Sequence, residues 1–310
     1  MSIEMRAVFG GELEKMMKTN EDIVVVDADL AKANGTIGLR DVYPDRALDV
    51  GVAEQNMASV AAGLSSYGFI PFITSFTPFA TRRIADQVAI SISYAKQNVK
   101  IVGTDPGVTA EYNGGTHMSM EDIGVLRSIP GMVIFEPVDA VQLKAAMPRL
   151  VEYYGPVYIR LFRKTIENIF GEDYEFDLFK ADKVSDGTDV TIAATGIMVH
   201  EAVAAAKVLS AEGISAEVIN FHTIKPLDEK ALLSSVQKTG CIVTAENHNV
   251  IGGLKSAVAE SLIEKCPVPL AAVGVPDVFG EVGKVDELKE KYGLTCDEIV
   301  KKAKEVMKKK

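Results

Sequence analysis

The chain has 310 residues, of which 47% are hydrophobic and 25% are charged, and its formal net charge is −10. This composition is close to the average of globular proteins, and the length suffices for two domains of ordinary size. The negative charge argues against broad nucleic-acid binding, which requires a basic face. No run of about 18 consecutive apolar residues occurs, so we expect no membrane span.

The three cysteines, Cys241, Cys266 and Cys296, have no metal-ligand spacing. An odd and sparse set in a chain of this length favours reduced thiols and a cytoplasmic location. The N-terminal stretch MSIEMRAVFGGELEKMM lacks the apolar core of a signal peptide, which favours the same location.

The first half of the chain alternates short β-branched runs with helical segments. This alternation is typical of a parallel sheet covered by helices on both faces. The expected strands are 23–30, 69–76, 99–105, 132–137 and 156–163. The expected helices are 57–68, 82–97, 120–129 and 139–154. We therefore predict a first domain over residues 1–175.

A polar, aperiodic stretch over 164–187 predicts a linker, with the domain boundary near 175–187. After it the alternation resumes. The expected strands are 189–196, 214–221 and 241–247, and the expected helices are 198–213, 227–240 and 252–265. The fold class we expect is α/β, with two domains that each hold a mostly parallel sheet flanked by helices, the second over 187–310.

Six motifs follow one another along the chain. They are DVGVAEQNMASVAAGLS, TSFTPF, GGTHMSMEDIGVLRSIPGM, YIRLFRK, INFHTIKPLD and ENHNVIGGLKSAV. Each is weak alone, but their order and spacing resemble the C-terminal part of a transketolase over nearly the whole chain. The resemblance implies a pyrimidine-binding domain followed by a transketolase C-terminal domain. It also implies a thiamine diphosphate enzyme that moves a two-carbon ketol unit from a ketose or ketose phosphate donor to an aldose acceptor.

Glu54 stands at the entrance of a small-residue, apolar helical stretch. By itself it would equally suit a helix N-terminus, where the macrodipole stabilises a carboxylate. The resemblance implies that the matching glutamate binds the aminopyrimidine ring of thiamine diphosphate and activates the cofactor by favouring its imino tautomer. The neighbours Val52, Ala53, Met57 and Ala58 suit a desolvated carboxylate better than a surface cap, so we expect Glu54 to be semi-buried against a cofactor.

Phe76 and Phe79 lie in the SFTPF stretch at the end of an expected strand. Core packing is the usual fate of a phenylalanine there. The resemblance implies instead a stacking wall for the aminopyrimidine, which would contribute beyond the burial of area. Transketolases of this kind often carry a further aromatic residue nearby, whereas Arg82 and Arg83 occupy that region here.

His117 is one of four histidines and sits in a Gly-rich turn before an expected helix. A lone histidine is more often structural, but such a turn suits an exposed functional group. The resemblance implies that His117 contacts substrate hydroxyls and moves protons or stabilises oxyanions. His222 and His248 also invite a catalytic interpretation, but packing near a domain interface is the more common outcome.

Arg163 closes the strand YIRLFR, and Arg6 lies near the N-terminus. The simplest interpretation of Arg163 is a solvated cation at a strand end. The resemblance implies that both arginines hold the substrate phosphate, for which a guanidinium fork is well suited.

Three positions depart from the family pattern. Asp105 stands where transketolases carry a phosphate-contacting histidine, and Asn113 stands where an aspartate contacts a substrate hydroxyl. Ala33, beside Lys32, replaces a phosphate-contacting serine. Because a carboxylate works against an anion in the same place, we expect a substrate whose far end differs from common sugar phosphates. The expected substrate is unphosphorylated, is branched, or ends in another anion that Lys32, Arg6 and Arg163 would hold.

The diphosphate half of a thiamine diphosphate site is missing. That half needs a GDG followed by a downstream Asn, which together hold Mg²⁺, and the chain contains no GDG. We therefore expect no metal ligand here and a partner, the N-terminal transketolase subunit, that supplies the Mg²⁺ and diphosphate site. The expected assembly is a heterotetramer with homodimer contacts.

Three alternatives stay open. A 1-deoxyxylulose 5-phosphate synthase and the β subunit of a 2-oxo acid dehydrogenase share this two-domain half, although the TH-containing loop and TSFTPF favour transketolase over the dehydrogenase. A non-catalytic assembly paralogue is motivated by the changed positions 33, 105 and 113. The retention of Glu54 opposes it, because a buried acid with no cofactor to face carries a desolvation cost.

Overall fold

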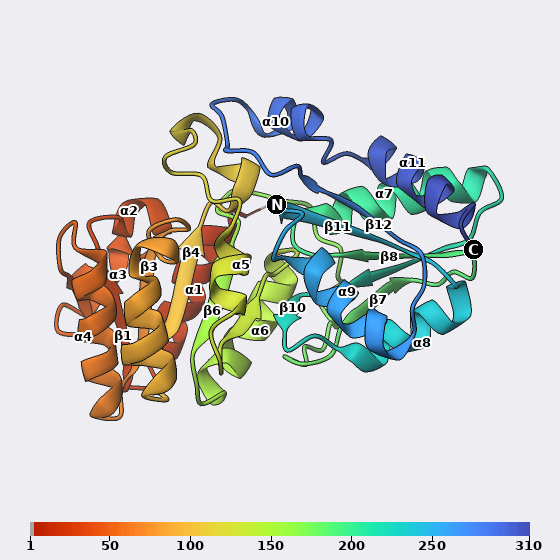
Figure 1. Ribbon diagram of the computed structural model, residues 1–310. Coiled ribbons are helices and arrows are strands. Elements are labelled where there is room, and N and C mark those ends of the chain that lie inside the picture. The colour runs from red at the N-terminus through yellow and green to blue at the C-terminus, as the bar shows by residue number, and fades with distance from the viewer. Residues whose placement is uncertain (1–2) are drawn as a thin grey trace.

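The computed structural model describes residues 3–310, which form two α/β domains side by side (Figure 1). The first sheet has seven strands, in the spatial order β10 (Thr223–Lys225), β5 (Val133–Phe135), β6 (Val157–Leu161), β4 (Lys100–Thr104), β3 (Ile70–Phe76), β1 (Ile23–Asp27) and β2 (Ala47–Asp49). The second has five, in the order β12 (Leu270–Val275), β11 (Ile242–Asn249), β8 (Val190–Ala194), β9 (Ala216–Asn220) and β7 (Asp182–Ser185). Only β10 and β7 pair antiparallel within the described residues, which confirms two mostly parallel sheets.

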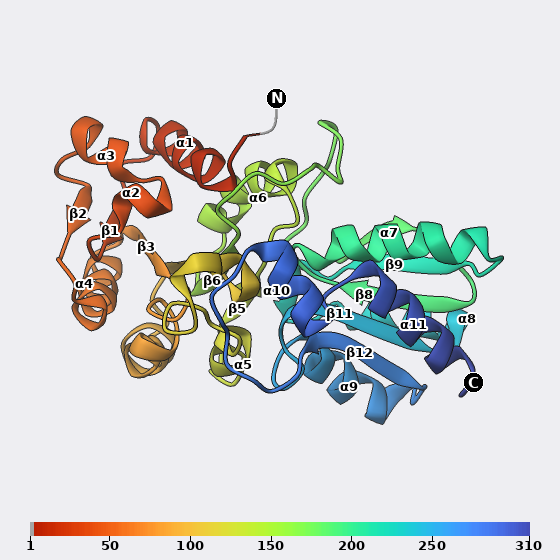
Figure 2. The ribbon, with the colours of Figure 1, turned by 90° about the horizontal axis from the view of Figure 1, so that it is seen from above.

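Helices cover both faces of each sheet (Figure 2). In the first domain they are α1 (Met5–Met17), α2 (Ala31–Asn34), α3 (Ile37–Val42), α4 (Glu54–Ser66), α5 (Asp122–Arg127) and α6 (Ala140–Glu152), with the 3₁₀ helices η1 (Arg82–Ile84) and η3 (Gly107–Asn113) and the π-helix η2 (Gln87–Tyr94). In the second domain they are α7 (Met198–Ala211), α8 (Glu229–Thr239), α9 (Leu254–Lys265), α10 (Val285–Tyr292) and α11 (Cys296–Met307).

The cores follow from the pattern of apolar residues. All positions of β1 and β4 are buried, as expected for parallel strands that carry helices on both faces. On one face, α4 and η2 pack against the sheet, and on the other face α1 and α6 do so. Helix α1 buries residues at four-residue spacing along a single stripe.

Several expected elements differ in detail. The expected helix 82–97 is divided into η1 and η2, and π-helical segments are rare and are often found at functional sites. The stretch 164–187, expected to be a linker, contains β7, which adds an antiparallel edge strand to the second sheet. A polar, half-exposed edge strand carries no apolar period, and this explains why the sequence pattern did not predict it.

The two domains share a strand. β10 comes from the second half of the chain, yet it pairs antiparallel with β5 and extends the first sheet. The backbone N–H of Glu136 donates to the carbonyl of His222 at 2.8 Å. The His222 ring is fully buried against Phe135, with centroids 5.7 Å apart, and His248 is fully buried as well. Both histidines therefore pack where the domains meet.

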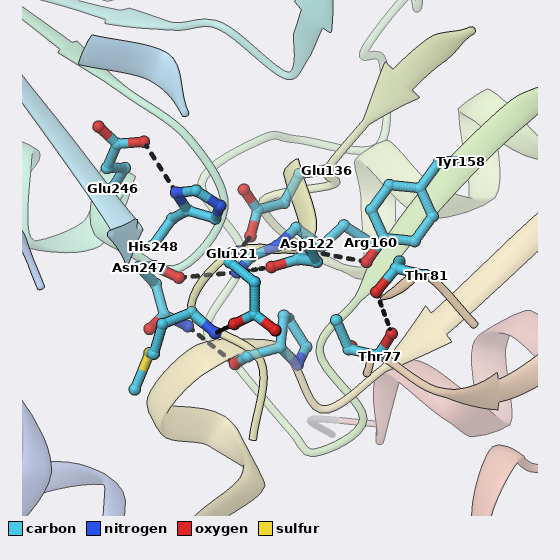
Figure 3. A network of polar contacts seen from close by, with 12 residues as sticks. Thr77, Thr81, Glu121, Asp122, Glu136, Tyr158, Arg160, Glu246, Asn247 and His248 are labelled. Atoms are coloured by element: carbon cyan, nitrogen blue, oxygen red, sulfur yellow. Dashed lines mark hydrogen bonds and ion pairs between the residues drawn. The ribbon is translucent and has the colours of Figure 1, made fainter. Parts of the chain in front are cut away.

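A buried polar network ties the domains together around Arg160, on β6 (Figure 3). Its side chain is fully buried. Nε donates to Asp122 Oδ2 at 2.6 Å, Nη1 to Glu136 Oε1 at 2.5 Å, and Nη2 to the carbonyl of Asn247, in the second domain, at 2.7 Å. Tyr158 adds a hydroxyl bond to Asp122 at 2.7 Å. Burial alone would raise the pKa of Asp122, but the guanidinium of Arg160 outweighs it, so the pKa is lowered and the carboxylate is ionised.

We expect Arg160→Met to lower the free energy of unfolding by about 3–5 kcal/mol, because two buried carboxylates would lose their cation. Urea denaturation followed by circular dichroism measures this change. The control is Arg149→Met, which breaks an exposed pair with Glu152 and should change stability by less than about 0.5 kcal/mol. A loss below about 1 kcal/mol for Arg160→Met would show that the network is not needed for stability.

Candidate functional site

The expected site residues lie at the carboxyl edge of the first sheet. Because β1, β3, β4 and β6 run parallel, the segments that follow them emerge at the same edge. Phe76 ends β3, Asp105 follows β4, and Arg163 follows β6. Glu54 opens α4 at this edge as well, after β2.

Glu54 is 4% exposed, so it is buried as expected and more deeply than the semi-buried position that the sequence predicted. Its Oε1 accepts a hydrogen bond from Arg83 Nη1 at 3.0 Å. Its Oε2 has no hydrogen-bond partner within residues 3–310. The Arg83 guanidinium lies 4.0 Å from the centroid of the Phe79 ring, a cation–π contact. Arg83 therefore joins the acid to the aromatic wall, although the sequence showed it only as a replacement for an expected aromatic residue.

His117 lies edge-on against both phenylalanines. Its ring centroid is 5.2 Å from that of Phe79 and 6.0 Å from that of Phe76, and the two phenyl rings are 6.3 Å apart. Nδ1 is 2.8 Å from the hydroxyl of Thr116. The imidazole is only partly buried, so it combines a fixed orientation with access to solvent.

Two arginines converge on one carbonyl oxygen. Arg163 Nη1 donates to the carbonyl of Ala33 at 3.4 Å, and Arg6 Nη1 donates to the same oxygen at 3.3 Å. Arg163 also pairs with Asp105, and its guanidinium lies 5.3 Å from the Phe76 centroid. The backbone N–H of Arg6 bonds to the carbonyl of Arg163 at 3.0 Å, which fixes the start of α1 beside the end of β6.

Asp105 is 1% exposed and has a φ of 55°. A non-glycine residue in the left-handed region costs about 1 kcal/mol, and such residues gather at functional sites. Burial raises the pKa of Asp105 to about 6, although the positive charge of Arg163 opposes the rise. A buried carboxyl group with a raised pKa at the carboxyl edge of a parallel sheet is typical of a binding or catalytic position.

Polar atoms without hydrogen-bond partners gather in the same place. Within residues 3–310, Asn34 Nδ2, Ser75 Oγ and Arg163 Nε are buried and make no hydrogen bond, and neither carboxylate oxygen of Asp105 accepts a well-aligned one. Seven further buried polar atoms without partners lie elsewhere in the described residues. Because buried polar atoms are nearly always paired, the atoms at this edge are available for polar contacts with a ligand.

Two expected residues stand apart from these contacts. Lys32, in α2, and Asn113, at the end of η3, are both exposed. Neither side chain makes a hydrogen bond or an ion pair with another residue that the structure describes. Lys32 immediately precedes Ala33, the residue whose carbonyl accepts from the two arginines.

The second domain also positions the site. The Asn247 side chain accepts from the N–H of Val108 and donates to the carbonyl of Pro106, both at 3.0 Å. A Cβ on Gly107 would stand 2.2 Å from Asn247 Oδ1, so only glycine permits this approach. Asn247 thereby fixes the loop that leads to His117. No sequence pattern indicates this contact, apart from the run ENHN itself.

Within residues 3–310, no three or more His, Cys, Asp and Glu side chains are grouped so that they could hold a metal ion. No helix in this range is long and apolar enough to cross a membrane.

Comparisons with known proteins agree along the whole chain. Residues 1–168 match the family described as transketolase, pyrimidine binding domain, and residues 179–299 match transketolase, C-terminal domain. The chain is 56% identical to the 6-deoxy-6-sulfo-D-fructose transketolase subunit SqwH of Clostridium sp. (strain MSTE9), over 99% of this chain and 95% of that protein. It is 38% identical to an apulose-4-phosphate transketolase subunit of Phocaeicola vulgatus, over 99% and 98%. A solved structure described as "Split gene transketolase, inactive beta4 tetramer" is similar with a TM-score of 0.91 and 42% identity, over 100% of both chains.

We expect Asp105→Asn to become more stable relative to the unsubstituted chain as the pH rises. Because the folded-state pKa lies near 6, above the ordinary value of 3.8, the contribution of the protonated Asp105 is lost as the pH rises through 6. The gain of the variant between pH 4.5 and pH 7.5 should be about 2 kcal/mol. Urea denaturation at the two pH values measures it.

Asp49→Asn is the matched control. Asp49 also pairs with an arginine, Arg40, at a strand end. Burial would raise its pKa, but backbone N–H donors from Gly51 and Asp29 and the charge of Arg40 outweigh it, so the pKa is lowered. This variant should show no gain between the two pH values. An equal stability difference at both pH values for Asp105→Asn would contradict the assignment of a raised pKa.

Proposed function

The chain belongs to the transketolase family, and we propose on this premise that it is the pyrimidine-binding subunit of a two-chain transketolase. Such an enzyme transfers a two-carbon ketol unit from a ketose donor to an aldose acceptor, with thiamine diphosphate as cofactor. One arrangement supports this function above all: the buried Glu54 is joined by Arg83 to the ring of Phe79, and His117 lies beside that ring.

The residues of this edge fit the aminopyrimidine half of thiamine diphosphate. Glu54 has an unpaired oxygen that can bind a ring nitrogen and share a proton there, while Arg83 orients its other oxygen. Phe76 and Phe79 offer aromatic surface against which a flat ring can pack. When bound, the cofactor supplies the nucleophilic carbon that takes up the two-carbon unit.

His117 is the group we assign to proton transfer at the substrate. It is accessible, it is oriented by two aromatic rings and Thr116, and it lies on the same loop as Asn113. A positioned imidazole can take a proton from a donor hydroxyl as a carbon–carbon bond breaks and return it to the acceptor. Such transfer typically contributes about 10²- to 10⁴-fold to rate.

A partner chain supplies the rest of the site in this proposal. The chain lacks a GDG, and relatives that match it end to end are named as subunits. We infer an N-terminal subunit that binds Mg²⁺ and the diphosphate, in a heterotetramer with two copies of each chain. The three free cysteines support a cytoplasmic location. Within this chain we place the domain boundary between residues 175 and 182, ahead of β7.

The donor we propose is a ketose that ends in a sulfonate, the substrate type for which the relative at 56% identity is named. Arg6 and Arg163 meet at the carbonyl of Ala33 and can bind the oxygens of a tetrahedral anion. Lys32, the residue before Ala33, is the further cation that we assign to this end of the substrate. A sulfonate corresponds to the third possibility expected from the sequence, a substrate that ends in an anion other than phosphate.

Thiamine diphosphate titration tests this architecture. We expect the chain co-purified with its GDG-containing partner to bind the cofactor in the presence of Mg²⁺, because only the complex holds both halves of the site. The chain alone should give no saturable binding in isothermal titration calorimetry. Binding by the chain alone would show that its site is complete. Absence of binding by either would favour the non-catalytic paralogue, and product analysis with pyruvate or another 2-oxo acid would reveal the two alternative enzymes.

We expect Glu54→Gln to lower the kcat of the complex by about 10²- to 10³-fold, because an amide cannot share a proton with the cofactor ring. Initial-rate assays at saturating cofactor measure the change. Glu121→Gln is a suitable control, since Glu121 also pairs with an arginine, Arg82, and should stay within about twofold of the unsubstituted complex. A loss below tenfold for Glu54→Gln, with the complex intact, speaks against the assigned function of Glu54.

A further inference from the structure

We propose that Asp105 selects the charge of the donor's far end, favouring a monoanion over a dianion by partly neutralising Arg163. This inference deepens the proposed function and rests on it. A sulfonate carries one negative charge, whereas a phosphate monoester, with a second pKa near 6, carries close to two at pH 7.5.

The charges around the carbonyl of Ala33 are nearly balanced. Arg163 pairs with Asp105, and Arg6 Nε pairs with Glu4 Oε2 at 2.8 Å. Each guanidinium therefore already has a carboxylate partner. The charges of these two pairs cancel, so this edge attracts a second negative charge less strongly than two unpaired arginines would.

The backbone holds Asp105 in this position. Its N–H donates to the carbonyl of Leu161 at 3.1 Å, and its φ of 55° directs the residue off the end of β4. The side chain is 1% exposed, so bulk solvent does not screen it. Burial raises its pKa to about 6, which still leaves the carboxylate mainly ionised at pH 7.5. A bound anion therefore meets a fixed negative charge.

The unpaired donors of the site suit a weakly charged ligand. Arg163 Nε and Asn34 Nδ2 are buried and make no hydrogen bond within residues 3–310. They can donate to the oxygens of an anion without adding charge beyond that of Arg163. Since an additional unit charge near 6 Å from Asp105 would weaken binding by about tenfold at an intermediate effective dielectric, the dianion is the disfavoured ligand.

The test compares two donors with the assembled complex. The donors are 6-deoxy-6-sulfofructose and fructose 6-phosphate, with one common aldose acceptor at pH 7.5, and the readout is the ratio of their kcat/KM values. We expect the sulfonate to be preferred by the unsubstituted complex. In Asp105→Asn the kcat/KM of the phosphate donor should rise by about tenfold more than that of the sulfonate donor, because the removed carboxylate repelled two negative charges on the phosphate and one on the sulfonate.

Asp49→Asn is again the matched control. It removes a carboxylate from an arginine pair in the same sheet, but β2 lies three strand positions from β4, or about 14 Å away. Charges at that separation are largely screened at physiological salt. The ratio of the two kcat/KM values should therefore stay unchanged in this variant.

The outcomes separate the two proposals. If the unsubstituted complex turns over neither donor, the proposed function fails. If it turns over donors but Asp105→Asn changes both kcat/KM values equally, or lowers both, the function stands and the selection by Asp105 is wrong. An equal fall would assign Asp105 to contact with a substrate hydroxyl instead.

A second measurement needs no variant. Propane-1-sulfonate and ethyl phosphate are nearly equal in size and differ in charge at pH 7.5. As competitive inhibitors of the unsubstituted complex, the sulfonate should have an inhibition constant about tenfold lower. An equal or lower constant for ethyl phosphate overturns the proposal.

Discussion

A single buried cation, the guanidinium of Arg160, sets the arrangement of the two domains. In a dry interior it needs anionic or carbonyl partners, and it takes Asp122 and Glu136 from the first domain and the carbonyl of Asn247 from the second. An apolar interface would tolerate some sliding, whereas the directed bond from Arg160 to the carbonyl of Asn247 restricts it. Arg160 lies on β6 and Arg163 follows the end of that strand, so β6 connects the domain interface to the two arginines at the sheet edge.

The site at the sheet edge takes its geometry from this arrangement. Asn247 binds Arg160 through its backbone and the loop before His117 through its side chain, so it connects the charge network to that loop. At the other end of the site, Arg163 contacts Phe76 as well as Asp105. The acid, the aromatic rings, the histidine and the two arginines thus form one continuous set of contacts around the left-handed backbone of Asp105.

Much of this can be predicted from the sequence, and the failures have physical causes. The strands are recognisable because buried parallel strands are uninterrupted apolar runs, and Glu54 because an acid among small apolar residues is unusual. The sequence does not show that Arg83 pairs with Glu54, because no local pattern indicates an ion pair between residues 29 positions apart. The π-helix, β7 and the contacts of Asn247 depend on tertiary packing, and the pairing of Asp105 with Arg163 depends on two strands that lie far apart in the chain.

The shared strand has a consequence for synthesis on the ribosome. Until Thr223–Lys225 has left the exit tunnel, the edge of β5 is open and can pair with any other strand, and the carboxylates around Arg160 lack the cover of the second domain. The first domain therefore cannot complete its own sheet, because the last strand, β10, comes from the second half of the chain. Nascent chains that stall between the domains carry an exposed edge strand, and chaperones that bind such edges would meet this protein late in its translation, not early.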